Sequence, residues 1–374
     1  MSPAKDLDAE LEFALTEEQE MIRDTARKFT EDSLEKGAEA RDANLEFARA
    51  EFDALGELGF PGLTVSDDRG GAGMGQVAAV IAFEELARSG ASTSMSLAMH
   101  LELGARLLDH AASSGTANLE SGIEELAAGA KIASCSGLAG EFTVDGGKVA
   151  GRGAPMPNAT VADVFVVRVV DGDATRVCMV AKGDTGVSVE ALDAPLGLRN
   201  AGLGSLVLDG AALESMVTIA TGSAADDLVE RSLAAMRLAT AATLVGLADS
   251  ARVRAVRYSQ ERIAFGKPLS AQQAVALKLG RMTEAVVSAR QLVRSAARAM
   301  EEGRAAPLAA ALAKSVAGEA AVRCADEAIQ IHGGYGFVTE YEVERLYRDS
   351  KVCCVLFGDE DACRLEVADG LLTA

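Results

Sequence analysis

The stretch Gln330-Ile331-His332-Gly333-Gly334-Tyr335-Gly336 is the most informative part of this sequence. Upstream of it lie Arg262-Ile263-Ala264-Phe265-Gly266-Lys267-Pro268 and Gln273, and downstream lies Arg348-Asp349-Ser350-Lys351. From Ala225 onwards the apolar spacing predicts long helices, with a capping-box pattern at Ser270 and Gln273 and a helix end at Gly333. The quoted segments are therefore expected at the ends of packed helices.

The chain before this region has two parts that differ in residue pattern, one typical of helices and one typical of strands. Thr16 and Gln19 form a capping-box pattern, and helical spacing then predicts helices over 49–58, 77–89, 93–110 and 119–127. From about Ile132 to Ala220, short β-branched runs broken by Gly, Asp and Pro predict strands over 164–170, 176–180, 187–192 and 205–208. We expect an N-terminal helical domain (1–127), a shortened β-domain (128–222) and a C-terminal helical domain (223–374).

Composition excludes several classes of protein. With 374 residues, 49% hydrophobic, the chain is long enough to bury a large core. A net charge of −20 without a basic block argues against nucleic-acid and anionic-membrane binding. The six cysteines have no zinc-like spacing and no signal segment is evident, so we expect no metal site, buried reduced thiols and a cytoplasmic location.

In order and spacing, the C-terminal segments resemble the acyl-CoA dehydrogenase family. Its members carry Arg-x-x-Phe-Gly, Gln-x-x-Gly-Gly-x-Gly and Arg-Asp-x-Lys segments, followed by Glu-Gly-Thr. Leu15-Thr16-Glu17-Glu18-Gln19 and the glycines after Val65 resemble its N-terminal domain. The resemblance implies a mainly α fold with a central β-domain, the acyl-CoA dehydrogenase-like three-domain fold, and an FAD that lies across a subunit interface.

Carried over by position, the residues that face a neighbouring subunit's FAD are all present: Arg262, Phe265, Gln273, Gln330, Gly333 and Gly334. Arginine offers a charged fork to a diphosphate oxygen, phenylalanine offers an apolar ring, and glycines let the backbone approach the cofactor. In the alternative interpretation, Gln273 only caps a helix, Gly333 only ends one, and Arg262 pairs with a surface acid. His332 is expected to be packed or hydrogen-bonded, and Glu344, Arg345, Arg348 and Asp349 to form ion pairs on a helix surface.

The catalytic half of the family's site is missing. Removal of an acyl thioester's α-proton needs a carboxylate, yet the position of the family's usual Glu falls on Phe357. The second known location falls on Met236, before Arg237. Asp359 and Glu360 lie nearby but are better explained as the acidic start of a helix.

The β-domain has also lost its flavin contacts. The family's Thr-Glu-Pro and Gly-Ser-Asp loop is largely deleted between Ser134 and Asp145, and Ala150-Gly151-Arg152 replaces the segment that packs on the flavin ring. Ser136 is the only remnant that could donate to flavin.

Because the losses lie on this chain's own active-site side, the preferred hypothesis is a non-catalytic subunit that completes a homologous partner's FAD site. The pattern is similar to the α2β2 heterotetramers of actinobacterial family members that break down sterol side chains. The resemblance implies an acyl-CoA substrate, from fatty acid or sterol side-chain catabolism, and allows an electron-transfer flavoprotein as electron acceptor. Two alternatives remain: a self-sufficient homo-oligomeric enzyme with Asp359 or Glu360 as a relocated base, and a flavin-free binding or scaffolding module.

We also expect the C-terminal helices to form an oligomer interface through apolar faces such as Leu279, Met282, Val286 and Val287.

Overall fold

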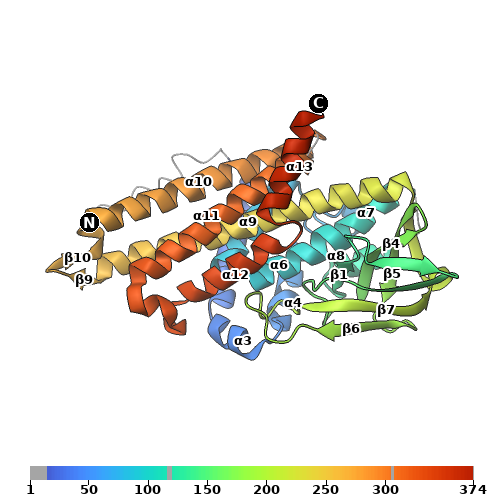
Figure 1. Cartoon of the computed structure of the whole chain (residues 1–374), viewed down its shortest axis with the longest axis horizontal. Coiled ribbons are helices and arrows are strands. Elements are labelled where there is room, and N and C mark those ends of the chain that lie inside the picture. The colour runs from blue at the N-terminus through green and yellow to red at the C-terminus, as the bar shows by residue number, and fades with distance from the viewer. Residues whose placement is uncertain (1–14, 116–119, 305–306, 374) are drawn as a thin grey trace.

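The structure, a computed structural model, describes residues 15–115, 120–304 and 307–373. Helices make up most of the described chain, and one sheet lies between an N-terminal and a C-terminal helical region in the sequence (Figure 1). The order of helices, sheet and helices agrees with the predicted mainly α fold with a central β-domain. No helix in the described part of the chain is long and apolar enough to cross a membrane.

The N-terminal region consists of short helices around two buried ones. The capping box at its start is confirmed, because the amide of Gln19 donates to the Thr16 hydroxyl and the Gln19 side chain accepts from the Thr16 amide. The helix predicted over 93–110 is interrupted by a π-turn at Leu101–Ala105. The helices are α2 (Glu17–Phe29), α3 (Ala38–Asn44), α4 (Arg49–Glu57), α5 (Gln76–Leu86), α6 (Ala91–His100), α7 (Arg106–Ser113) and α8 (Glu120–Ala127).

The middle region folds into an eight-stranded sheet with its own core around Phe142, Phe165 and Val167. The strand order is β6-β7-β3-β2-β4-β5-β8, and β1 pairs in parallel with β4. The four β-branched runs predicted as strands are confirmed, whereas four further strands, β1, β2, β3 and β8, were not predicted. The strands are β1 (Ala133–Ser136), β2 (Phe142–Asp145), β3 (Lys148–Arg152), β4 (Val164–Asp171), β5 (Ala174–Ala181), β6 (Val187–Ala191), β7 (Gly204–Ala212) and β8 (Val217–Thr221).

The C-terminal region is a bundle built on the long helix α9 (Ser223–Glu261). Helix α5 packs closely against α9, because a Cβ at Gly246 would lie 2.2 Å from the carbonyl oxygen of Glu84. Figure 1 shows the small hairpin of β9 (Ile263–Ala264) and β10 (Lys267–Pro268) at one end of the molecule and the sheet towards the other. The remaining helices are α10 (Gln273–Glu301), α11 (Pro307–His332), α12 (Val343–Val355) and α13 (Glu360–Leu372).

The Arg348-Asp349 pair ties the three regions together, which corrects the prediction of ion pairs confined to a helix surface. Arg348 does bind Glu344 one turn away, but it also binds Asp42 of α3 at 2.7 Å. Asp349 is buried and accepts from the amides of Ala91 and Leu198. Burial raises the pKa of Asp349, partly offset by these two amides. The motif is therefore structural.

The apolar residues proposed for an oligomer interface mostly belong to the core. Met282 and Val286 are fully buried inside the chain, and Leu279 packs against the same core. The face of α10 that remains exposed is thus a different one. The six cysteines are free and buried, as predicted.

Candidate cofactor-binding site

The residues predicted to face a cofactor lie at the end of the bundle occupied by the β9–β10 hairpin (Figure 1). Two register pairs close this hairpin, Lys267 with Ala264 and Pro268 with Ile263. Its two turn residues, Phe265 and Gly266, have φ of 53° and 78°. Positive φ at both positions is the conformation of a tight hairpin turn, in which phenylalanine is unusual.

The ring of Phe265 projects from this turn and is 97% exposed. An aromatic ring in that position buries no apolar surface within the chain.

Arg262 ends helix α9 in an extended conformation, and its carbonyl accepts from the amide of Leu269. Its side chain is exposed and makes no ion pair with any residue that the structure describes. The alternative that Arg262 pairs with a surface acid of its own chain is therefore not supported. Its guanidinium is free to bind an anion.

Gln273 is the first residue of α10, and it is exposed. The residue before it, Gln272, is the N-cap, and no side chain caps the helix. The predicted capping box between Ser270 and Gln273 is therefore wrong, because the helix begins three residues after Ser270. Gln273 has no capping role.

Gly333 and Gly334 follow the last residue of α11, His332. Gly333 has φ of 61°, which favours glycine and explains it as a helix terminator. Gly334 does not need a positive φ, and a Cβ there would meet nothing within 4 Å. No contact with the described residues requires glycine at position 334. Gln330, one turn earlier on α11, is also exposed.

Beneath these residues lies a cluster of four aromatic rings. The ring of Tyr258 stacks on His332 with centroids 4.2 Å apart, and Tyr335 and Tyr341 lie edge-on or tilted beside them. His332 is buried, and its Nδ1 lies 2.7 Å from the carbonyl oxygen of Ala328. Burial lowers the pKa of His332. The prediction that this histidine is packed and hydrogen-bonded is confirmed.

Phe357, which was predicted to fall at the position of the family's catalytic carboxylate, is a packed apolar ring. Phe357 is buried and has φ of 59°, an outlier for a bulky residue. Its carbonyl oxygen accepts from Nε of Arg237, which also binds both carboxylate oxygens of Glu366. Met236 at the second location is fully buried.

The two nearby acids have other partners. The Asp359 carboxylate caps helix α13 by accepting from the amide of Ala362 at 2.8 Å. Glu360 packs against α11, because a Cβ at Gly318 would lie 2.7 Å from its Oε1. Asp359 is thus engaged as a helix cap, and Glu360 contacts α11.

Ser136, the predicted remnant of the family's flavin loop, is buried. The hydroxyl of Ser136 is buried and has no hydrogen-bond partner in the described chain. Gly153 lies directly on it, since a Cβ there would come within 2.0 Å of that oxygen. The ring of Phe142 packs against Gly137, Gly151 and Gly153. Ser136 is therefore covered by its own chain rather than presented to a cofactor.

The described residues contain no group of three or more His, Cys, Asp or Glu side chains placed to hold a metal ion.

Comparison with known proteins agrees with this fold. Residues 16–116 match the acyl-CoA dehydrogenase N-terminal domain, and residues 227–372 match the acyl-CoA dehydrogenase C-terminal domain. A probable acyl-CoA dehydrogenase of Bacillus subtilis (strain 168) is 30% identical over 97% of this chain and 100% of its own.

Two solved structures have the same architecture. The butyryl-CoA dehydrogenase of Megasphaera elsdenii superimposes with a TM-score of 0.89 at 27% identity, covering 96% of this chain and 100% of that one. A glutaryl-CoA dehydrogenase of Mycobacterium smegmatis in complex with FADH2 has a TM-score of 0.87 at 21% identity, covering 98% and 96%.

Proposed function

This chain belongs to the acyl-CoA dehydrogenase family, and we propose that it takes part in FAD-dependent α,β-dehydrogenation of an acyl-CoA by completing a homologous partner's FAD site. One observation carries the proposal. The groups that would face a neighbour's cofactor are exposed and unpaired, whereas Phe357, Met236 and the covered Ser136 occupy this chain's own site. A site that had decayed at random would have lost contacts on both sides.

The arrangement of the elements in space also supports an FAD site that is shared between two subunits. The β9–β10 hairpin and strand β1 lie in different parts of the molecule, with the length of the C-terminal helices between the hairpin and the sheet (Figure 1). One FAD held by a hairpin and by a β-domain would therefore belong to two subunits. In this arrangement the hairpin of this chain reaches the partner's cofactor.

Bound FAD would supply a hydride acceptor for the substrate's β-carbon. Arg262 would neutralise a diphosphate oxygen, and Phe265 would cover an apolar part of the adenosine end. Gly334 would let the backbone approach without a Cβ in the way. The carboxylate that removes the α-proton would come from the partner, because none is placed for that task around Phe357 in the described chain.

Two other functions have less support. A self-sufficient enzyme would need Asp359 or Glu360 as the base, but Asp359 is a helix cap and Glu360 faces α11. A flavin-free module would not explain why Phe265 is exposed or why Arg262 forms no ion pair with a described residue. We propose a fatty acyl or sterol side-chain thioester as the substrate, and an electron-transfer flavoprotein as the acceptor.

The test is reconstitution of FAD binding with a homologous chain that carries the Thr-Glu-Pro, Gly-Ser-Asp and Glu motifs. We expect no FAD on this chain alone and one FAD per pair of unlike chains. Arg262→Ala should weaken FAD binding by about 1.5–3 kcal/mol, or roughly ten- to a hundredfold, through loss of a charge-assisted hydrogen bond.

Arg257→Ala is the matched control, since Arg257 is an exposed arginine on the last turns of the same helix and binds Glu261. This variant and Ser136→Ala should bind FAD as the wild type does. One FAD per chain without a partner would instead favour the self-sufficient enzyme. A large loss with Ser136→Ala and none with Arg262→Ala would reverse the assignment of the two halves.

A further inference from the structure

A buried lysine holds the segment that joins α12 to α13. Lys314 of α11 is only 1% exposed. Its Nζ donates to the carbonyl oxygen of Cys354 at 2.9 Å and to that of Gly358. No carboxylate in the described chain forms an ion pair with this cation, and burial lowers the pKa of Lys314. A cation buried without an acidic partner is costly, so the two carbonyl contacts compensate for its burial.

A second buried cation holds the same segment from another helix. Nε of Arg237, on α9, donates to the carbonyl oxygen of Phe357 at 3.0 Å, and the guanidinium also binds Glu366 of α13. The last carbonyls of a helix have no partner within it, and a cation beside them also interacts favourably with the helix dipole. Side chains of α9 and α11 therefore fix the backbone between α12 and α13.

This backbone adopts an unfavourable conformation. Phe357 has φ of 59° and Gly358 has φ of 100°. A positive φ in a bulky residue persists only where the surrounding structure imposes it. At Gly358 a Cβ would lie 3.3 Å from Nη2 of Arg237, so glycine is also needed for the close approach of that side chain. The contacts of Lys314 and Arg237 supply the constraint, and the Phe357 ring packs into the core.

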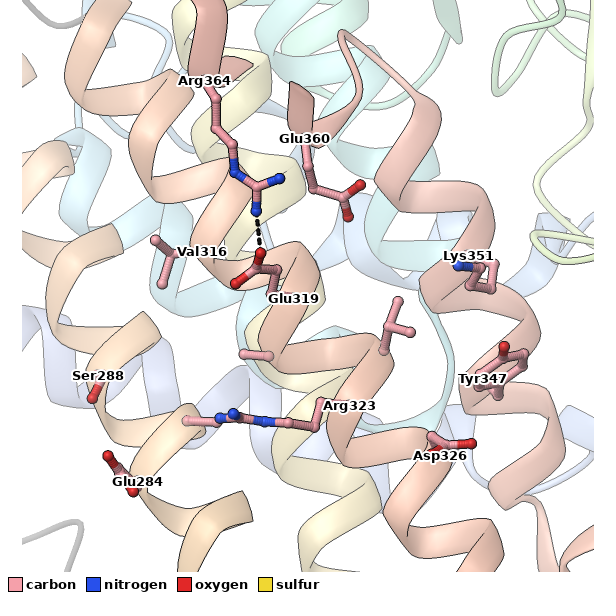
Figure 2. Close-up of a pocket in the computed structure, with 13 residues that line it drawn as sticks. Glu284, Ser288, Val316, Glu319, Arg323, Asp326, Tyr347, Lys351, Glu360 and Arg364 are labelled. Carbon is pink, nitrogen blue, oxygen red and sulfur yellow. Dashed lines mark hydrogen bonds and ion pairs between the residues drawn. The ribbon is translucent and has the colours of Figure 1, made fainter. Parts of the chain in front are cut away.

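The end of α12 and the start of α13 also pack directly on α11. Gly318 lies one turn after Lys314, and a Cβ there would lie 2.7 Å from Oε1 of Glu360 and 3.2 Å from Sγ of Cys354. Figure 2 shows Glu360 at the start of α13 and Lys351 on α12, both beside α11. The link between the two helices is thus pressed against the helix that carries Lys314.

We propose that Lys314 is a positioning residue that keeps this chain's own site closed. By binding the carbonyls of Cys354 and Gly358, it holds both ends of the link, so that Phe357 stays turned inwards at the position predicted for the family's carboxylate. This role goes beyond the proposed cofactor role, which concerns the hairpin and a partner's FAD. Removing the cation should release the ring and open the interior of this chain.

Two buried thiols next to the link make the proposal testable in the chain alone. Cys354 lies in the last turn of α12, and Sγ of Cys363 donates to the carbonyl oxygen of Gly358 at 3.7 Å. Burial raises the pKa of both thiols, that of Cys354 to about 12, so neither reacts readily while the link is closed. Lys314→Met keeps an unbranched side chain but removes the cation. Both thiols should then react with iodoacetamide about tenfold faster or more, as mapped by mass spectrometry.

The ring itself can be followed by fluorescence. The chain contains no tryptophan, so Phe357→Trp introduces a single reporter at the position of interest. Acrylamide should quench this reporter weakly when Lys314 is present and several times more strongly when Lys314→Met is added. This measurement does not depend on the reactivity of the thiols.

Two further variants separate the cation from packing and from general loss of stability. Lys351→Met is the matched control, because Lys351 is an exposed lysine of α12 that lines the open groove beside α11 (Figure 2). It should change neither readout. Lys314→Arg keeps a cation that can donate to both carbonyls and should keep the link closed. Cys135 and Cys178 of the β-domain should stay unreactive in every variant.

Three results would overturn the proposal. They are unchanged alkylation and quenching in Lys314→Met, equally fast alkylation in Lys314→Arg and Lys314→Met, and faster reaction of all six cysteines together. Each measurement is made without FAD or a second protein. Failure here therefore leaves the proposed cofactor role standing, and loss of FAD binding in Arg262→Ala would not alter either readout.

Discussion

Replacing Asp249 with asparagine should destabilise the protein by about 3–5 kcal/mol, the usual loss when one partner of a buried ion pair is removed. Asp249 lies on α9, and its side chain is only 3% exposed. Its carboxylate binds Arg88, Arg252 at 2.6 Å and Arg290 at 3.3 Å. Arg88 lies in the short 3-10 turn Ala87–Ser89 (η4), Arg252 on α9 and Arg290 on α10, so the carboxylate joins both helical regions.

The magnitude follows from what asparagine leaves behind. It keeps the shape of the side chain but removes the negative charge, so three guanidiniums remain near one another with little access to water. Burial raises the pKa of Asp249, but Arg88, Arg290 and Arg252 outweigh it and hold the pKa well below its usual range. The stability that this carboxylate contributes is therefore present above about pH 4 and is lost as the pH falls below that value.

Urea unfolding at pH 7, followed by circular dichroism, measures the loss. Asp361→Asn is the matched control, because Asp361 forms an ion pair with Arg364 on the exposed surface, and it should cost less than about 0.5 kcal/mol. In the Asp249→Asn background, Arg88→Met should cost less than it does in the wild type, since it removes one of the three cations that have lost the Asp249 carboxylate. A loss below about 1 kcal/mol, or additive effects of the two substitutions, would refute this account of the network.

Three further predictions concern single residues. Burial lowers the pKa of His100 to about 4, so the advantage of wild type over His100→Gln should shrink by about 3 kcal/mol as the pH falls from about 6.5 to about 4; a difference independent of pH would contradict this. Phe265→Ala should leave the isolated chain's unfolding free energy unchanged within about 0.5 kcal/mol yet weaken the reconstituted complex by about 1.5–3 kcal/mol in a titration, because the ring is covered only there; equal losses in both would count against an external contact. Phe357→Glu should not give the isolated chain measurable turnover of an acyl-CoA with an artificial electron acceptor, since Ser136 stays covered, and turnover would show that a base alone was missing.

The fold was predictable from local patterns. Helical spacing and the Thr16–Gln19 capping box identify elements whose residues are close in sequence, and these were confirmed. Strands β1 and β3 were missed because their residues include Ser, Gly and Lys, and because β1 pairs with β4 and β3 pairs with β7, both far along the chain. Motif order, which needs no coordinates, was enough to indicate the family.

The sequence by itself determined which groups are present: Arg262, Phe265 and the glycines on one side, and no carboxylate at Phe357 or Met236. Only the tertiary structure decided whether those groups are available. It left Arg262 unpaired and Phe265 exposed, covered the Ser136 hydroxyl with Gly153, and used Asp359 as a helix cap. Residue identity fixes what chemistry a side chain can perform, but burial and hydrogen bonding depend on distant segments that meet only when the chain folds.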